Sequence, residues 1–408
     1  MQTLVKLEQA QQILLDLVTS REEKLISLFE AAGQVLSQDI KANRDIPPFD
    51  RSPLDGYAMR AEDISQANSS NPVKLRVIER IAAGYVATKS VSPGTTIGVM
   101  TGAPIPAGAD VVIKFEEIDL IEDHIMVNQS LKSNSNIIPR GEDVTKDEII
   151  APRGTLITPP ILGLIASQGI NQVPVFPKLK VAILSTGDEL LEPDEEMHPG
   201  KIYNSNLYTL YAHCIELGIE PISLGIVVDN VSAIAKSIRY GLENADIVIS
   251  TGGVSVGDYD LFFDAMEDIE AKTLFWKVDI KPGSAMLVAT KDDKPIIGLS
   301  GNPASALITF ELIVVPLLKK MLGLTNYLPP RTSATLVDGF GKASPLRRFL
   351  RGNLYHQDGS NYIKLTGSQT NGVLKSLIDC NVLIDVPAGS KSITAGEKVE
   401  AYIIDHKS

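Results

Sequence analysis

The sequence is poor in cysteine, histidine and aromatic residues. Its 408 residues include two cysteines, Cys214 and Cys380, and five histidines. Two cysteines cannot build a disulfide framework or a thiolate metal site, so we interpret both as small core residues. No two histidines recur at the three- or four-residue spacing of a zinc-binding helix, so a bound metal is expected to use oxygen ligands.

Long apolar runs and an excess of basic charge are also lacking. The longest apolar stretch, 308–318, is interrupted by Glu311 and is shorter than the ~20 residues that a membrane-spanning helix needs. Residues 1–24 mix Lys, Glu and Gln with leucine, unlike a signal or transit peptide. The formal net charge of −12 argues against a general nucleic-acid binder, which needs a basic face. We therefore expect a cytoplasmic protein that binds neither membranes nor nucleic acids.

The order of the sequence patterns predicts a multidomain chain of α/β and β parts. A chain of this length exceeds the ~250–300 residues at which single cores stop growing. Apolar residues recur at helical spacing over 4–18, and 27–35 predicts a second short helix. Short runs rich in Val, Ile and Thr over 47–138 predict a β-rich insertion. A helix over 160–168 is expected to pair with the first helices, which would make the first domain discontinuous.

The second half of the chain alternates strands with helices. We expect strands over 180–185, 222–228, 246–250, 273–279, 285–289 and 295–299, and helices over 205–217, over 231–242 and from Pro303. Such alternation is typical of a doubly wound, mostly parallel sheet with helices on both faces. After Pro330 the pattern is β again, which predicts a small C-terminal barrel or sandwich.

Acidic residues follow three of these predicted strands. Asp188 and Glu189 follow the first, Asp229 follows the second, and Asp258 lies in the loop after the third. Ligands of open α/β sheets bind at the carboxyl ends of the strands, so these side chains are expected to converge there. Converging carboxylates suit Mg²⁺, which takes oxygen ligands.

The loop 251–258 is rich in glycine and hydroxyl residues. Gly252, Gly253 and Ser255 would let backbone N–H groups approach phosphate oxygens, and Thr186 follows the neighbouring strand. The loop is neither a Walker motif nor a dinucleotide fingerprint, and a tight strand-to-helix turn explains it equally well.

Two further segments suit anions. Lys277 and Lys281 lie four residues apart in a predicted strand and would share one face, although a solvated strand edge is the alternative. Pro303 suits the first turn of a helix whose N-terminus is a ready anion site, although helix capping by Asn302 also explains this segment.

Other charged residues lie in turn-like segments. Asp55 precedes a glycine, and Thr101 and Asp143 lie in similarly irregular stretches of the β-rich part. Arg347 and Arg348 are interpreted as a solvated cluster rather than a binding site, whereas Arg351 is kept as a candidate site residue.

Taken together, eight ordered segments resemble the molybdopterin molybdenumtransferases of the MoeA family, whose eukaryotic relatives include the C-terminal domain of gephyrin. The resemblance spans the chain. The segments are 52–58, 101–110, 140–144, 185–190, 200–206, 252–258, 275–283 and 301–306.

The resemblance implies four domains and a homodimer with a shared active cleft. The domains would be a helical linking domain of residues 1–46 and 144–176, a β-rich inserted domain of 47–143, an α/β substrate-binding domain of 177–326 and a C-terminal β domain of 327–408. It also implies that molybdate is inserted into adenylyl-molybdopterin in a Mg²⁺-dependent step that releases AMP. A molybdopterin adenylyltransferase is implied as a docking partner.

By position, the resemblance assigns roles to residues already singled out. Asp258 would act in pyrophosphate cleavage, with Asp188, Glu189, Lys277 and Lys281 as further catalytic residues. Asp188, Glu189 and Asp229 would be the metal ligands. The substrate-binding residues would be Thr186, Asp229, Gly252, Gly253, Ser255, Pro303 and Arg351, joined by Asp55, Thr101 and Asp143 from the neighbouring subunit.

The chain departs from the family pattern at two places. Ser300 stands where the family usually has proline, and Asn371 stands where it often has serine. The second change replaces a hydroxyl near the expected oxyanion with an amide, which can still donate a hydrogen bond. The alternatives to molybdenum insertion are a pterin- or nucleotide-binding pyrophosphatase and a scaffold protein with the same fold.

Overall fold

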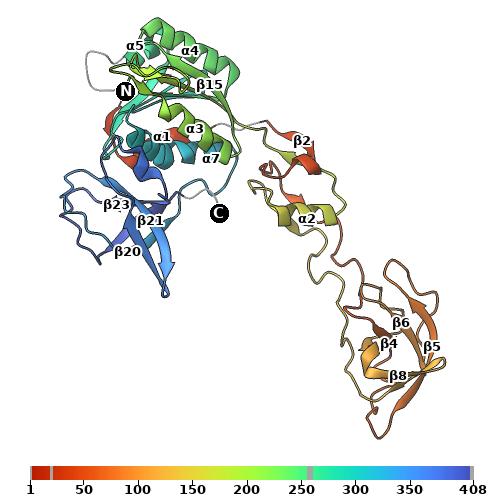
Figure 1. Ribbon diagram of the computed structural model, residues 1–408. Helices are drawn as coiled ribbons and strands as arrows, with labels where there is room; N and C mark the ends of the chain where they lie inside the picture. The colour runs from red at the N-terminus through yellow and green to blue at the C-terminus, as the bar shows by residue number, and fades with distance from the viewer. Residues whose placement is uncertain (1, 19–21, 255–260, 405–408) are drawn as a thin grey trace.

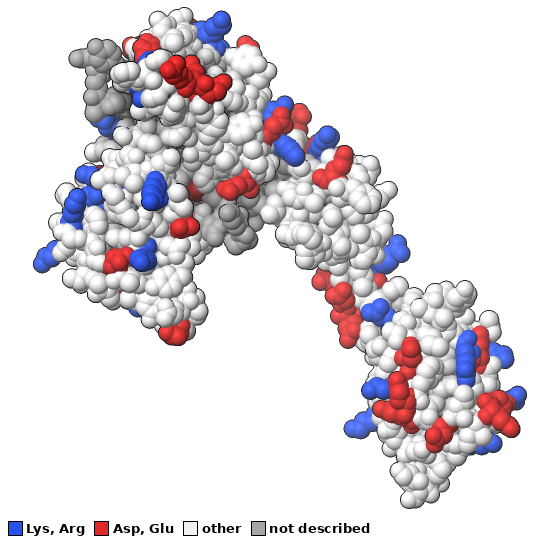
Figure 2. All heavy atoms as spheres, in the orientation of Figure 1, with Lys and Arg blue, Asp and Glu red and all other residues white. Residues whose placement is uncertain are grey.

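The computed structural model describes residues 2–18, 22–254 and 261–404. It has an elongated shape, with a large α/β unit and a C-terminal barrel at one end and a separate β unit at the other (Figure 1). Within the described ranges, no helix combines the length and the apolar character needed to cross a bilayer. On the face drawn in Figure 2, basic and acidic side chains are interspersed over the separate β unit.

A seven-stranded mixed sheet forms the centre of the α/β unit. Its order is β1, β17, β18, β19, β16, β12, β15, with β18 antiparallel to both of its neighbours. The strands are β1 (Gln2–Val5), β12 (Lys180–Thr186), β15 (Glu220–Val227), β16 (Ile247–Thr251), β17 (Lys272–Val278), β18 (Met286–Lys291) and β19 (Lys294–Leu299). The predicted doubly wound α/β domain is confirmed.

Helices cover both faces of this sheet because its central strands are apolar on both sides. Val181 and Ile183 face one core, whereas Ala182 and Leu184 face the other. The first core packs on α1 (Leu7–Leu15), α3 (Ser205–Glu216), α6 (Pro303–Thr309), a π-helical turn η3 (Phe310–Val314) and α7 (Val315–Met321). The second packs on α4 (Val231–Asn244) and α5 (Leu261–Asp268).

The two cysteines behave as the sequence predicted. Cys214 lies fully buried in the first core, and burial raises the pKa of its thiol to about 12. Cys380 packs against the same core, and burial raises its pKa to about 11. Both thiols are protonated near neutral pH, so neither is an activated nucleophile.

The N-terminal segment differs from its prediction. Strand β1 joins the central sheet beside β17, and α1 packs against α7 and the π-helical turn, so the expected pairing with the helix near 160–168 is wrong. This segment is held in place by the apolar side chains of Val5, Leu7 and Leu14, which are buried in the first core.

The predicted helix over 27–35 is also wrong. Its place is taken by β2 (Lys24–Ser27) and one 3₁₀ turn η1 (Leu28–Glu30). Strand β2 pairs with β11 (Gln172–Val175), and Gly33, with φ of +75°, lies past the turn, so the backbone cannot continue as a helix. The predicted helix over 160–168 is present as α2 (Pro159–Ser167).

Two ladders form a small linking unit around α2. Strand β2 pairs with β11, and β3 (Ile40–Lys41) pairs with β10 (Ile149–Ala151). Leu36, Ile165 and Val173 share its core. Chain segments on either side of the β insertion therefore fold together, while the exact domain boundaries stay a prediction.

The insertion is a six-stranded sheet in the order β7, β4, β6, β5, β9, β8. Its strands are β4 (Gly56–Met59), β5 (Val73–Ile81), β6 (Thr95–Val99), β7 (Val111–Lys114), β8 (Ile118–Ile121) and β9 (His124–Val127), with a 3₁₀ turn η2 (Phe115–Glu117). In Figure 1 this sheet lies at the far end of the molecule from the α/β unit, beyond α2.

The C-terminal part closes into a barrel in the order β20, β22, β21, β23, β24, as the sequence predicted. Its strands are β20 (Arg331–Leu336), β21 (Arg348–Gln357), β22 (Ser360–Leu365), β23 (Val382–Val386) and β24 (Lys398–Ile403), with a 3₁₀ turn η4 (Leu374–Leu377). A two-stranded pair, β13 (Leu190–Leu191) and β14 (Ile202–Tyr203), lies outside the large sheets.

Candidate active site

A polar cleft of about 580 Å³ lies at the carboxyl ends of β12, β16 and β19. Strand β12 has β15 on one side and β16 on the other, so the chain reverses its winding here and leaves a crevice. The cleft is lined by Thr186, Gly187, Glu189, Ile202, Asp229, Gly252, Gly253, Val254, Gly283, Ser284, Ala285, Ser300, Gly301, Asn302, Ser305 and Asn371.

The acidic residues after β12 and β15 do meet at one side of this cleft. The backbone N–H of Asp188 donates to Asp229 Oδ2 and that of Asp229 donates to Asp188 Oδ1, each at 3.2 Å. Glu189 folds back over Gly187, where an added Cβ would lie 2.5 Å from its Oε2 atom. All three acidic residues are exposed to solvent.

These carboxylates fit one mode of Mg²⁺ binding. Among the residues that the structure describes, no group of three or more His, Cys, Asp or Glu side chains could hold a metal by itself. Mg²⁺ is usually held by one or two carboxylates together with substrate phosphates and water. Asp188 and Asp229 offer such a pair, because the carboxylate of each accepts a hydrogen bond from the backbone N–H of the other.

Gly252 and Gly253 bring the backbone against Thr186. An added Cβ on Gly252 would lie 2.2 Å from the Thr186 carbonyl oxygen, and one on Gly253 would lie 3.0 Å from Thr186 Oγ1. The Gly252 N–H already donates to the Leu299 carbonyl at 3.0 Å, so it is not available to a phosphate. The Thr186 hydroxyl is buried and has no partner within the described chain. Thr186 is also one of the residues that line the cleft.

The start of α6 differs in detail from its prediction. Pro303 occupies the first turn, but Asn302 makes no side-chain capping bond. The Ala304 N–H donates to the Asn371 carbonyl at 3.1 Å, and the Asn302 N–H donates to Ser300 Oγ at 3.2 Å. Both positions that depart from the family pattern, Ser300 and Asn371, thus lie in the cleft wall.

The two lysines do not share a strand face, so that prediction is wrong. Strand β17 ends at Val278, and Lys281 lies beyond it before a cis Pro282. Lys277 has a φ of +68°, and its ammonium lies 4.0 Å from the centre of the Trp276 ring. The left-handed backbone at Lys277 breaks the alternation on which the prediction relied. Neither lysine lines the cleft as described.

The predicted residues of the β-rich part lie elsewhere in the molecule. The Thr101 N–H and hydroxyl donate to Asp55 Oδ1 at 2.7 and 2.8 Å, and these bonds hold the pKa of Asp55 below its ordinary value. Asp55 immediately precedes β4, which Figure 1 places at the end of the molecule remote from the cleft. Asp143 lies between the linking unit and the insertion, where its N–H donates to the Ile46 carbonyl. Within one chain, these residues are not brought to the cleft.

Arg351 is fully buried in the barrel. Its Nη2 donates to the carbonyls of Ser368 and Thr370 at 2.9 and 3.1 Å, which fixes the loop that leads to Asn371. Burial lowers the pKa of Arg351, and the nearby Cys380 acts in the opposite direction. Its Nε and Nη1 atoms are buried without a partner in the part of the chain that the structure describes.

Sequence reasoning and structure also differ in coverage. Asp258 and Ser255 lie outside the described residues. Conversely, sequence reasoning did not single out Ser284, which lines the cleft, and it included Ile202 and Ser305, which also line it, only as members of longer segments. Ser284 directly follows the Pro-Gly turn and Ser305 lies in the first turn of α6, so a strand-end criterion extended by one turn would have found both.

The arrangement suits a polar, phosphorylated ligand. Hydroxyl and amide groups line the same cleft as Glu189 and Asp229, whose carboxylates could share a divalent cation with such a ligand.

Comparison with known proteins covers nearly the whole chain. Residues 5–169 match a family model described as "MoeA N-terminal region (domain I and II)", residues 182–320 match "Probable molybdopterin binding domain", and residues 333–404 match "MoeA C-terminal region (domain IV)". A molybdopterin molybdenumtransferase of Bacillus subtilis is 37% identical over 389 residues, which cover 94% of this chain and 90% of that protein. One from Staphylococcus aureus is 35% identical over 380 residues, which cover 93% and 91%.

Solved structures give the same result. The crystal structure of the molybdopterin biosynthesis moeA protein from Pyrococcus horikoshii OT3 has a TM-score of 0.83 and 34% identity, and the match covers 98% of this chain and 100% of that one. A second Pyrococcus moea structure has a TM-score of 0.84 and 30% identity, with 98% and 99% covered.

Proposed function

Because this chain belongs to the MoeA family of molybdopterin molybdenumtransferases, we propose that it inserts molybdate into adenylyl-molybdopterin and releases AMP in a Mg²⁺-dependent step. It is a transferase of molybdenum cofactor biosynthesis. The observation that carries the finer proposal is the cleft that Glu189 and Asp229 line together with Thr186 and the glycines of the β16 loop.

The pyrophosphate of the substrate would lie over Thr186, Gly252 and Gly253. Two phosphate groups need close backbone approach, and the absence of a Cβ at both glycines lets the backbone of the β16 loop pack directly against Thr186 at the cleft. Asp188 and Asp229 would hold Mg²⁺ together with phosphate oxygens, whose charge the ion neutralises when bound, and Glu189 stays a predicted third ligand. Asp258 keeps its proposed role in pyrophosphate cleavage. Lys277 and Lys281 stay proposed catalytic residues, although neither is among the described residues that line the cleft.

The direct test measures AMP release from adenylyl-molybdopterin by the purified protein with Mg²⁺, with and without molybdate. We expect AMP release that depends on both Mg²⁺ and molybdate, together with a molybdenum-loaded pterin. AMP release that does not depend on molybdate would favour a pyrophosphatase. Binding without turnover, and without Mg²⁺-linked stabilisation, would favour a scaffold.

We further propose that two subunits complete each cleft. Asp55, Thr101 and Asp143 are placed away from Asp188 and Glu189 within one chain, so they would reach the cleft of a second copy. A twofold dimer would contain two such composite clefts. The side chains of Tyr208, Tyr211 and Ile215, spaced along one side of α3, are 36% to 56% exposed and would suit the contact between copies.

Mixing of inactive variants tests the shared cleft. Asp55→Asn and Glu189→Gln are each expected to lose most activity, because one damages the donated part and the other the receiving part. After subunit exchange at equal concentrations, half of the dimers are mixed and each holds one intact cleft, so activity should return to about a quarter of the wild-type value.

The matched control mixes Glu189→Gln with Asp229→Asn, two changes on the same side of the cleft. That mixture should regain nothing, because every cleft of a mixed dimer keeps one damaged residue. Mixed dimers of Asp55→Asn and Glu189→Gln can be identified by differently sized tags. If these mixed dimers remain inactive, the shared cleft is ruled out.

The adenylyltransferase partner and the cytoplasmic location stay predictions.

A further inference from the structure

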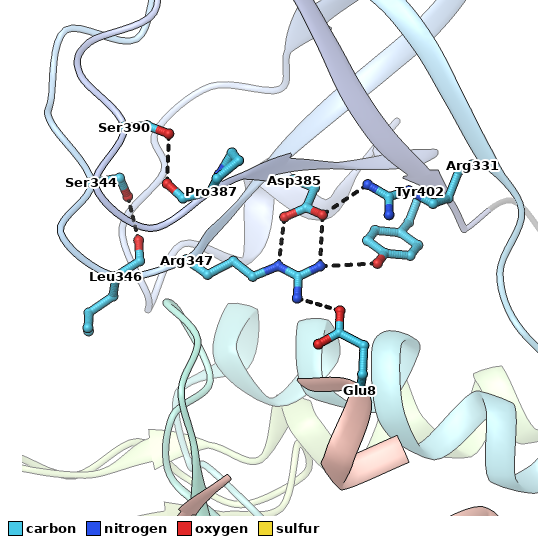
Figure 3. Close-up of polar contacts among 9 residues, drawn as sticks. All are labelled: Glu8, Arg331, Ser344, Leu346, Arg347, Asp385, Pro387, Ser390 and Tyr402. Carbon is cyan, nitrogen blue, oxygen red and sulfur yellow. Dashed lines mark hydrogen bonds and ion pairs between the residues drawn. The ribbon is translucent and has the colours of Figure 1, made fainter. Parts of the chain in front are cut away.

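Arg347 is the centre of a charged network where the barrel meets α1 (Figure 3). Its Nε and Nη2 donate to the two carboxylate oxygens of Asp385, each at 2.8 Å, and its Nη1 donates to Glu8 at 2.6 Å. Nη2 also lies 3.2 Å from the Tyr402 hydroxyl, and Arg331 donates to Asp385 at 3.1 Å. The interpretation of Arg347 as part of a solvated cluster is therefore wrong.

Glu8 is the member of this network that lies outside the barrel. Asp385 and Arg347 are shielded, with side chains 7% and 22% exposed, whereas the side chain of Glu8 is 60% exposed. Partial burial alone would raise the pKa of Glu8, but the hydrogen bond and the charge of Arg347 lower it overall. A single exposed ion pair contributes little to stability, but a bidentate guanidinium with several partners contributes more.

The same junction joins three backbone segments. Val5 of β1 is paired with Val278 of β17, and the Asp279 N–H donates to the Val5 carbonyl at 2.8 Å. Further along, the Lys281 N–H donates to the Arg347 carbonyl and the Phe349 N–H donates to the Lys281 carbonyl, each at 2.9 Å. The ion pair from Glu8 to Arg347 therefore bridges the first and third segments, with the Lys281 segment between them.

Both flanks of this junction reach the cleft. Two residues after Lys281, Gly283 begins the part of the cleft wall that continues with Ser284. The barrel supplies Asn371 to the same cleft, where its carbonyl accepts from the Ala304 N–H. The position of the barrel on the α/β unit thus sets the shape of the wall.

We infer that Glu8 and Arg347 are positioning residues for the reaction, holding the barrel against the α/β unit so that the Lys281–Ser284 segment and Asn371 form one continuous cleft wall. The effect of the Glu8–Arg347 contact on the kinetics rests on the function proposed above. The mechanical contact itself does not, so the two parts can fail separately.

Hydrogen exchange of a Glu8→Gln variant tests the mechanical part. This variant keeps the size of the side chain and removes its charge. The amides of Lys281, Phe349 and Ala304, which donate between the two units, should exchange about 3- to 10-fold faster, while amides of the β21–β22 ladder keep the wild-type rate. High salt should produce the same acceleration in the wild-type protein and little change in the variant, because exposed charges are screened.

Arg348→Gln is the matched control. Arg348 directly follows Arg347 and starts β21, but its side chain contacts Ser344 and Phe340 inside the barrel. Its loss should leave the three amides between the units unchanged. Unchanged exchange of these amides in Glu8→Gln, or equal acceleration throughout the barrel, would overturn the inference.

Steady-state kinetics test the functional part. In Glu8→Gln we expect the KM for adenylyl-molybdopterin to rise about 3- to 10-fold with kcat within about twofold of wild type, and Glu8→Asp to restore part of the loss. Faster exchange with an unchanged KM would overturn the positioning role. Faster exchange in a protein whose wild type releases no AMP would support the contact and reject the proposed function instead.

Discussion

A Gly252→Ala variant is expected to release AMP at least about 100-fold more slowly than wild type and to lose about 2–4 kcal/mol of unfolding free energy. The backbone of Gly252 has a φ of +94°, and an added Cβ would lie 2.2 Å from the Thr186 carbonyl and 2.9 Å from its hydroxyl. Neither the Gly252 backbone nor the Thr186 backbone can easily move away from the other. The Gly252 N–H is bonded to Leu299, and the preceding Thr251 is paired with Ser185 in the sheet.

The expected loss of rate follows from where the strain is relieved. The loop after Thr251 must move outward, away from Thr186, and the space for the substrate phosphates changes with it. Denaturant unfolding and AMP release, measured on the same preparation, check the two effects together. A change of about 1 Å in a substrate-positioning group commonly costs about 100-fold in rate.

Gly359→Ala separates steric conflict from backbone strain. Gly359 also has a positive φ, +74°, but nothing lies within 4 Å of its added Cβ. This control should lose about 1 kcal/mol and keep its activity. A Gly252→Ala enzyme as stable and as active as Gly359→Ala would show that the loop adjusts freely, and the proposed phosphate site would be wrong.

The sequence predicted the cleft because its signals are local. Runs such as Val181 to Leu184 are apolar at every position, which is typical of a strand covered on both faces, and acids or glycines follow directly at the strand ends. The loop positions of Asp188, Glu189, Asp229 and Gly252 therefore followed from the strands alone.

The errors arose where distant segments or unusual backbone decide the structure. Strand β1 and α1 carry an ordinary amphipathic pattern, and their partners β17 and α7 lie more than 260 residues away. Lys277 adopts a left-handed backbone that no residue type nearby requires. The partners of Arg347, Asp385 and Glu8, lie 38 and 339 residues away. None of these contacts has a local sequence signal.

An Arg351→Met variant is expected to raise the KM for molybdate roughly 30- to 5,000-fold, which corresponds to the 2–5 kcal/mol typical of removing one side of a buried charged contact. The Arg351 guanidinium is completely buried, and its Nε and Nη1 donors are unpartnered within the described chain. Buried donors without acceptors are costly, so an oxyanion that reaches them gains a strong charge-assisted hydrogen bond. We therefore propose that molybdate is this acceptor.

Stability should respond far less than molybdate binding. Removal of Arg351 breaks the bonds to the carbonyls of Ser368 and Thr370, but both residues are exposed, so water can replace the lost donor. The substitution also removes a buried charge, a change that is often neutral when the replacement is apolar and of similar size. We expect the unfolding free energy to stay within about 2 kcal/mol of wild type.

Thermal unfolding with and without molybdate provides a reading that does not depend on turnover. Molybdate should raise the Tm of the wild-type protein and leave that of Arg351→Met unchanged, because only a bound ligand stabilises the native state. Arg351→Lys keeps the charge without the planar fork and should fall between the two. Arg351→Met could instead show the same molybdate-induced Tm shift and the same KM for molybdate as the wild type. That result would mean that the unpartnered donors of Arg351 serve the loop that carries Asn371 rather than the oxyanion.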